Sequence, residues 1–151
     1  LHVRSRRQRQ MCIRDSDITE QHGKQILDEI NKYRVANGLN ALSTRDDIEA
    51  LAQARAKEQT YYVSTYGALS HEGANDRLAP LTSYGELLQS HNFNAYVAYH
   101  SLYQQKVLEN WQASKEHNNY LLDKDSKYGA VGVFRDDING RVYISFIFSE
   151  D

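Results

Sequence analysis

Three side chains that could bind a metal ion or transfer a proton lie in polar segments of this 151-residue chain: His71, Glu86 and His117. A neutral imidazole binds divalent cations, and a carboxylate binds the same cations or accepts a proton. Each also has a simpler interpretation. A loop histidine is usually a surface residue, a lone glutamate a solvated charge, and a histidine at a helix end a cation that interacts with the helix dipole.

The elements around His117 favour a site. A helical segment that ends at the only tryptophan, Trp111, is followed by a polar turn that carries His117 and by a β-like run over residues 128–134. This order places a histidine at a helix end, beside a sheet.

Two amphipathic helices are predicted in the first half of the chain, over residues 18–37 and 45–64. Asp17 and Glu20 form a capping-box pattern at the start of the first helix, and Gly38 ends it. The inner faces of the two helices are predicted to consist of Ile26, Leu27, Ile30 and Tyr33, and of Ile48, Leu51, Ala52 and Tyr62.

The second half contains the predicted sheet. Residues 66–84 have no apolar period and indicate a loop with room for one helical turn, followed by a strand over 86–89, a helix over 94–113 and strands over 128–134 and 142–148. The inner side of that helix is predicted to carry Tyr96, Val97, His100, Tyr103, Val107, Leu108 and Trp111.

Asn139-Gly140 predicts a two-residue type I′ turn between the last two strands, because both residues tolerate a positive φ. Helices early in the chain and strands late predict an α+β domain with a small antiparallel sheet covered by helices.

Residues 1–16 differ in composition from the rest. They hold five of the 18 basic and one of the 20 acidic residues, so residues 17–151 have 13 basic and 19 acidic side chains and a net charge of −6. A basic tail can bind nucleic acid or anionic lipid. This one resembles translated adapter or vector sequence, and we expect a non-native or disordered tail that the domain does not need. The acidic remainder argues against a nucleic-acid partner.

The only cysteine, Cys12, lies in that tail, so residues 17–151 have no disulfide and no thiolate metal site. No apolar run is long enough to span a membrane.

Four short motifs occur in a consistent order: an Asn-x-x-Arg-x-x-x-Gly-Leu pattern over residues 31–39, Ser70-His71, Gly85-Glu86, and His117 after the tryptophan helix. Together they resemble the bacterial, SCP-like branch of the CAP superfamily, the domain of cysteine-rich secretory proteins, insect venom antigen 5 and plant pathogenesis-related proteins. The resemblance covers residues 26–148. It implies a three-layer α-β-α sandwich and a secreted or cell-surface protein whose signal peptide is not present in this chain.

The resemblance also implies that His71, His117 and Glu86 meet in a central cleft. Two imidazoles and a carboxylate suit Zn²⁺, which two histidines alone would bind weakly. Glu86 would be a third ligand, an acceptor that orients an imidazole, or a general base. Two functions remain open: a module that binds an extracellular protein, a cell-wall component or a lipid, and a metal-assisted, peptidase-like hydrolase with Glu86 as catalytic base.

Some positions depart from the family pattern. Ser114 stands where animal and plant members usually have a second acidic residue, and Glu116 is expected to be a solvated neighbour of His117. The other histidines are weaker candidates: His100 is expected in the core, and His22 and His91 have no companion at useful spacing.

Overall fold

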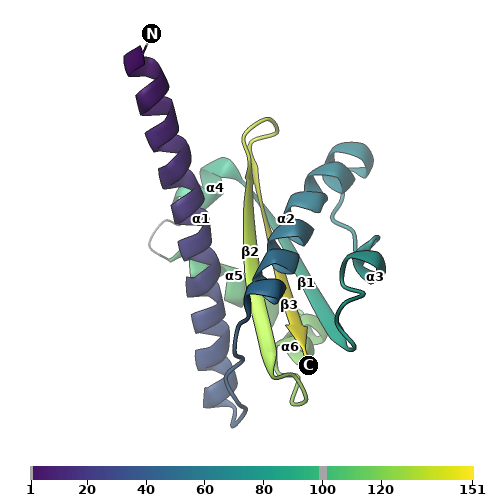
Figure 1. Ribbon diagram of the computed structural model, residues 1–151. Helices are drawn as coiled ribbons and strands as arrows, with labels where there is room; N and C mark the ends of the chain where they lie inside the picture. The colour runs from purple at the N-terminus through teal and green to yellow at the C-terminus, as the bar shows by residue number, and fades with distance from the viewer. Residues whose placement is uncertain (1, 99–101) are drawn as a thin grey trace.

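The computed structural model describes the backbone of residues 2–98 and 102–151 and the side chains of residues 19–98 and 102–151. The elements follow one another along the chain as shown in Figure 1. Their bounds are α1 His2–Ala36, α2 Asp46–Tyr66, α3 Ala74–Arg77, β1 Tyr84–Asn92, α4 Phe93–Ala98, α5 Tyr103–Gln112, α6 Lys115–Leu121, β2 Tyr128–Asp136 and β3 Arg141–Ser149.

The three strands form one antiparallel sheet in the order β1-β3-β2. The central strand β3 pairs with β1 through Leu87↔Phe146 and with β2 through Val131↔Phe146. Residues 142–149 of β3 are all buried, as expected for a strand covered on both faces. The predicted antiparallel sheet is therefore confirmed, and the strand over 86–89 is longer than expected.

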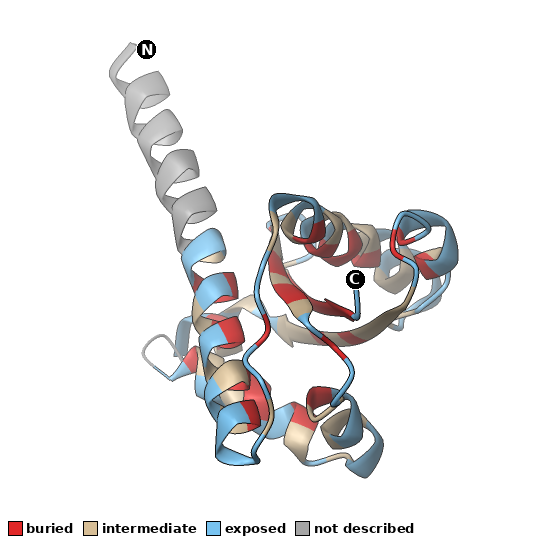
Figure 2. Ribbon diagram, turned by 60° about the horizontal axis from the view of Figure 1, so that its bottom comes forward, coloured by how far each residue is buried: buried red, intermediate tan, exposed pale blue. Residues whose placement is uncertain are grey.

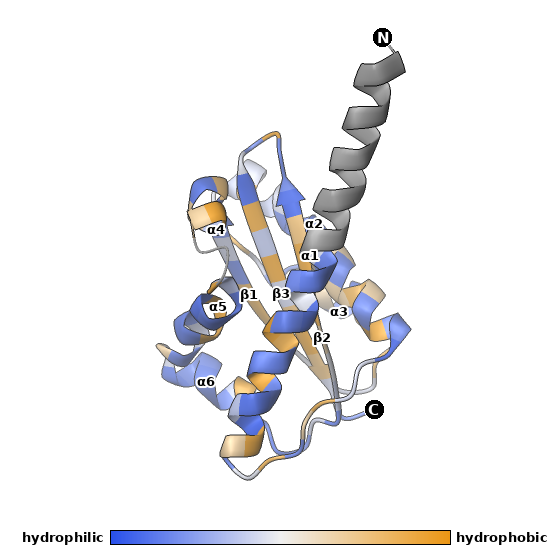
Figure 3. Ribbon diagram, turned by 90° about the vertical axis from the view of Figure 1, so that its left-hand side faces the viewer, coloured by the Kyte–Doolittle hydropathy of each residue, from blue (hydrophilic) through white to orange (hydrophobic). Residues whose placement is uncertain are grey.

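Helices cover both faces of the sheet. On one face α2 packs through Ile48 and Ala52 against Ile147 of β3. On the other face α1 and α5 pack through Ile26 and Trp111 onto a larger apolar cluster. Buried positions line the helix sides that face the sheet (Figure 2), and β2 and β3 carry hydrophobic stretches whereas β1 is mixed (Figure 3). This is the expected three-layer α-β-α sandwich.

The prediction of one helix over residues 94–113 is wrong, because the structure has two helices there, α4 and α5. Tyr96 and Trp111 are buried as predicted, whereas Val97 is 51% exposed. His100 lies outside the described residues, so its expected core position stays a prediction.

The helix expected over residues 18–37 ends at Ala36 as predicted but begins at His2. That residues 1–16 are a tail outside the domain stays a prediction. No helix within the described residues is long and apolar enough to cross a membrane.

The Asn-x-x-Arg motif holds the end of α1 against the rest of the domain. The Asn31 side chain bonds both the N–H and the C=O of Leu42. Arg34 is buried and donates to the carbonyl oxygens of Asn40, Leu121 and Asp123. Burial lowers the pKa of Arg34 below its ordinary value. These residues link α1 to α6 and therefore support the layer that carries His117.

The connection between β2 and β3 corrects the predicted turn. Asp136 pairs with Arg141, so the loop has four residues, and Gly140 has a φ of 66°. No described residue other than glycine has a positive φ, which excludes the type I′ conformation at Asn139. Instead, the Asp136 carboxylate accepts hydrogen bonds from the N–H groups of Ile138 and Asn139.

Replacing Gly140 tests this loop. We expect Gly140→Val to lower the free energy of unfolding by about 1–2 kcal/mol, because a β-branched residue is strained at a positive φ. Gly140→Asn is the matched control and should cost much less, since asparagine tolerates this conformation. Urea unfolding of the three proteins measures the difference, and equal stability of both variants would contradict the loop geometry.

Candidate functional site

The site is built around Glu86 of β1, whose side chain is 3% exposed. Arg55 of α2 is fully buried and donates two hydrogen bonds to this carboxylate, from Nε at 2.6 Å and from Nη2 at 3.1 Å. Nδ1 of His71 lies 2.8 Å from the Oε2 atom of Glu86. Both oxygens of Glu86 are therefore already engaged by protein groups.

Arg55 and Gln59 also hold the loop that carries His71. Arg55 donates to the carbonyl oxygens of Ser70 and Glu72 and forms an ion pair with Glu58 at 2.7 Å. Gln59 bonds both the N–H and the C=O of Ser70. The loop is thus fastened to α2 immediately before and after His71, which explains why an exposed histidine is well positioned.

The charges in the cluster favour an ionised Glu86. Burial opposes ionisation, but hydrogen bonds from His71 and Arg55, together with their positive charge, bring the pKa of Glu86 below its ordinary value. A carboxylate with a lowered pKa is a weak base near neutral pH.

The same hydrogen bond raises the pKa of His71 above its ordinary value, against the opposing effects of partial burial and of Arg55. The negative charge of Glu116 acts in the same direction as Glu86. Glu116 is exposed, as expected, but it also lies within electrostatic reach of His71. The N-terminal turn of α6 therefore borders the site.

His117 lies in α6 and not in a polar turn, which corrects the sequence interpretation. Ser114 is the N-cap of this helix, and its Oγ accepts a hydrogen bond from the His117 N–H at 3.4 Å. Ser114 therefore has a local role as a helix cap. The imidazole of His117 is half-buried, and among the described residues no hydrogen bond or ion pair joins it to His71 or Glu86.

The donor set fits a metal only in part. Within residues 19–98 and 102–151, no group of three or more His, Cys, Asp or Glu side chains is placed to hold a metal ion. Glu86 does not fit as a ligand, because Arg55 and His71 occupy its oxygens and the guanidinium would repel a cation. Its contact with Nδ1 instead leaves Nε2 of His71 for a ligand, the arrangement in which a carboxylate orients a metal-binding histidine.

The sequence interpretation missed Arg55, although α2 gives a signal for it. Arg55 falls on the same helical face as Ile48 and Ala52, where a charged residue is unexpected. A charged side chain on an otherwise apolar face must find a partner when it is buried. That partner could not be identified from the pattern alone.

His22 and His91, for which the sequence offers no companion at useful spacing, both lie beside aromatic side chains. His22 shares a hydrogen bond with the hydroxyl of Tyr96, and the rings of His22 and His91 lie 5.5 and 5.7 Å from that of Tyr103. Burial lowers the pKa of His91. This cluster belongs to the core between α1, β1 and α5, away from Glu86.

The sequence matches the family model described as CAP, the cysteine-rich secretory protein family, over residues 27–148. No curated protein matches the chain significantly. Solved structures share the fold at low sequence identity. A cysteine-rich secretory protein from Staphylococcus aureus is 18% identical with a TM-score of 0.65, and the match covers 87% of this chain and 38% of that one.

An outer surface protein from Borrelia burgdorferi is also 18% identical with a TM-score of 0.65, and the match covers 88% of this chain and 96% of that one. An extracellular protein with an SCP domain from Bacillus anthracis is 18% identical with a TM-score of 0.64, and the match covers 87% of this chain and 41% of that one. The chain thus spans well under half the length of the staphylococcal and Bacillus proteins. Because the family model matches most of its residues, the chain belongs to the CAP family of cysteine-rich secretory proteins.

Proposed function

We propose that this chain is an extracellular or cell-surface binding domain that recognises a protein, a cell-wall component or a lipid, with the His71–Glu86–Arg55 cluster as the element that shapes its cleft. The proposal is supported by the buried Glu86 carboxylate, both of whose oxygens are hydrogen-bonded to Arg55 or His71. A group held in this way orders the loop around His71. The proposed location is supported by two proteins of the same fold, an outer surface protein of Borrelia and an extracellular protein of Bacillus.

The hydrolase has less support. A general base must be free to accept a proton from water, and Glu86 has neither a free oxygen nor a raised pKa. The exposed group of the cluster is His71, whose side chain is 65% exposed, so the part that meets a partner is an imidazole backed by a carboxylate. When His71 is protonated, its Nε2 donates a hydrogen bond to an anionic or carbonyl ligand, and when it is neutral with its proton on Nδ1, Nε2 accepts one instead.

A binding assay and a cleavage assay separate the two functions. We expect labelled protein to bind intact bacterial cells saturably and to be displaced by unlabelled protein. Purified cell walls and lipid vesicles then show which surface component is recognised. We expect no zinc-dependent cleavage of casein, followed by mass spectrometry. Cleavage that Glu86→Gln abolishes would establish the hydrolase, and the absence of saturable cell binding would overturn the binding domain.

The ion pair itself can be tested through stability. Arg55→Leu leaves Glu86 buried without its partner and should lower the free energy of unfolding by about 3–5 kcal/mol. Arg55→Leu combined with Glu86→Leu should recover part of that loss. Arg77→Leu is the matched control, because Arg77 also pairs with Glu58 but is 49% exposed, and it should cost less than about 1 kcal/mol. Equal losses for Arg55→Leu and Arg77→Leu would rule out a structural ion pair.

Zinc binding through His71 and His117 stays a prediction, with Glu86 now expected to orient His71. Protons compete with the metal for both imidazoles, whose reference pKa is about 6.5, so affinity should rise about tenfold or more from pH 5.5 to 7.5. Because the pKa of His71 is raised, the rise in affinity should extend to higher pH than it would for an unperturbed histidine. Calorimetric titration should show weak binding that His71→Ala or His117→Ala nearly abolishes.

Glu86→Gln distinguishes its roles in the same titration. It keeps a hydrogen-bond acceptor for His71 but removes the charge, so we expect zinc affinity to fall by less than it does in the histidine variants. If all four proteins bind zinc equally, or if the wild type binds none at about millimolar zinc, the two histidines do not form a metal site.

A further inference from the structure

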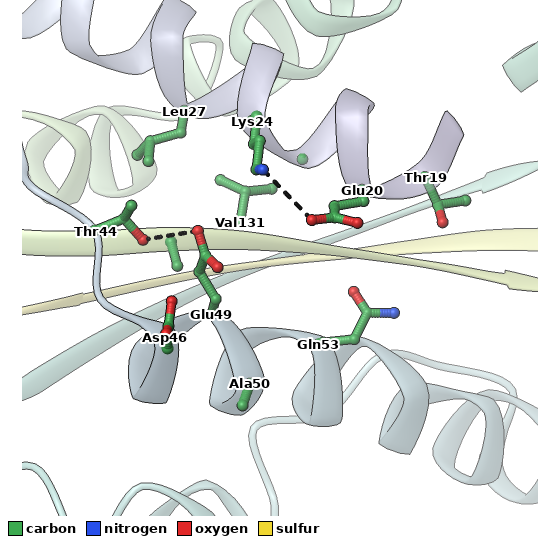
Figure 4. Close-up of a pocket in the computed structure, with 12 residues that line it drawn as sticks. Thr19, Glu20, Lys24, Leu27, Thr44, Asp46, Glu49, Ala50, Gln53 and Val131 are labelled. Carbon is green, nitrogen blue, oxygen red and sulfur yellow. Dashed lines mark hydrogen bonds and ion pairs between the residues drawn. The ribbon is translucent and has the colours of Figure 1, made fainter. Parts of the chain in front are cut away.

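The outer edge of β2 faces a groove between α1 and α2, on the other side of the molecule from His71 in the sheet order β1-β3-β2. The groove holds a cavity of about 390 Å³, lined among others by Glu20 and Leu27 of α1, Glu49 and Gln53 of α2, and Val131 of β2. Figure 4 shows the two helices flanking the strand, with these side chains projecting between them.

On either side of the cavity, other parts of the chain form hydrogen bonds with the backbone groups of this strand edge. Ser43 adds as a parallel bridge, donating to the Lys127 carbonyl and accepting from the Gly129 N–H, both at 2.9 Å. Further along, the Gln53 carboxamide donates to the Val133 carbonyl at 2.9 Å and accepts from the Val133 N–H at 3.2 Å. A backbone segment and a side-chain amide thus both act as partners of β2.

Between these two points one donor and one acceptor remain open. Gly129 and Val133 direct their backbone groups away from β3, and successive residues of a strand alternate, so Val131 directs its groups outward too. Gly23 of α1 lies against the Val131 carbonyl, where a Cβ atom would come within 2.5 Å of the oxygen. Within the described part of the chain, no protein group bonds the Gly129 C=O or the Val131 N–H from the groove.

The Gly129 C=O and the Val131 N–H have no partner among the residues that the structure describes, because the chain turns into α2 before it can pair with them. Two residues after Ser43, Arg45 would be the next residue to pair in a parallel ladder. The Arg45 carbonyl instead accepts the first hydrogen bond of α2, from the Glu49 N–H at 2.9 Å. The strand-like segment ends there, and its place beside Val131 is taken by the cavity.

We propose that this groove binds a short, extended, cationic peptide segment, one residue of which donates its N–H to Gly129 and accepts from Val131. A residue in an extended chain presents both groups on one side, which is how a strand is added to an open sheet edge. The cavity has room for a segment of only a few residues. The cavity is lined by three carboxylates, those of Glu20, Asp46 and Glu49, and by the ammonium group of Lys24. Lys24 is already paired with Glu20 at 3.4 Å. The charge of the groove therefore favours a basic side chain.

A blocked tripeptide, acetyl-Ala-Lys-Ala-amide, is a suitable probe because it carries the extended backbone and one positive charge. In a titration of ¹⁵N-labelled protein, we expect the Val131 amide signal to shift saturably, and its hydrogen exchange to slow, at about millimolar peptide. The same peptide with a methylated lysine N–H cannot donate to Gly129 and should bind about tenfold more weakly. Glutamate in place of lysine should weaken binding similarly.

Two variants place the peptide in the groove. Ala50→Trp adds a large side chain to the groove from an exposed position of α2 and should abolish the Val131 shift. Ala36→Trp is the matched control at an exposed position of α1 outside the groove and should bind like the wild type. Glu49→Gln tests the charge without changing the shape and should lower the affinity.

The inference is overturned if Val131 does not respond at about 10 mM peptide, or if the methylated peptide binds as well as the parent. Unchanged binding by Ala50→Trp would also overturn it. The outcome is independent of the His71 cluster, since none of these changes touches that site.

Discussion

The buried ion pair between Arg55 and Glu86 is the interaction on which the position of the His71 loop depends. Two charges removed from water are costly unless each finds partners for all its polar atoms. Arg55 meets this condition by donating to Glu86, to Glu58 and to two loop carbonyls, and Glu86 meets it by accepting from Arg55 and His71. The position of the loop is therefore a consequence of the ion pair, and His71 is held where the loop meets β1.

The same helix that supplies Arg55 also organises the opposite edge of the sheet. Ile48 and Ala52 pack on the sheet face, Arg55 extends toward β1, and Gln53 reaches the outer edge of β2. A three-stranded sheet has two edges and few residues with which to cover them. The β1 strand carries Glu86 of the charged cluster, and the outer edge of β2 is bonded by Ser43 and Gln53.

The burial of Glu86 and the exposure of His71 favour recognition over catalysis as the role of the His71 cluster. The Glu86 carboxylate is buried and hydrogen-bonded to Arg55 and His71, and its contact with Nδ1 fixes the orientation of the exposed His71 imidazole. A rigid support under one exposed polar group suits a surface that selects a partner. Glu116, in the N-terminal turn of α6, adds a negative charge that acts on His71.

Much of the fold could be predicted from the sequence, because helix and strand periods report which side of an element is buried. The stripe with Ile26 and Ile30, the alternating strand over 142–148 and the hairpin at Gly140 follow from local chemistry. The Asn-x-x-Arg pattern, Ser70-His71 and Gly85-Glu86 sufficed to indicate the family. Of the three side chains that the resemblance implied would meet, His71 and Glu86 are in contact, and the meeting with His117 stays a prediction.

The partners of polar groups were decided only by the tertiary structure. Arg55 and Glu86 are 31 residues apart and His22 and Tyr96 are 74 apart, so their meeting depends on how separate elements pack. The four-residue loop that ends at Gly140 likewise depends on the Asp136↔Arg141 register, which the turn residues alone do not determine. A local pattern records whether a position is buried, but not which distant donor or acceptor satisfies it there, because that choice is made by the packing of the whole domain.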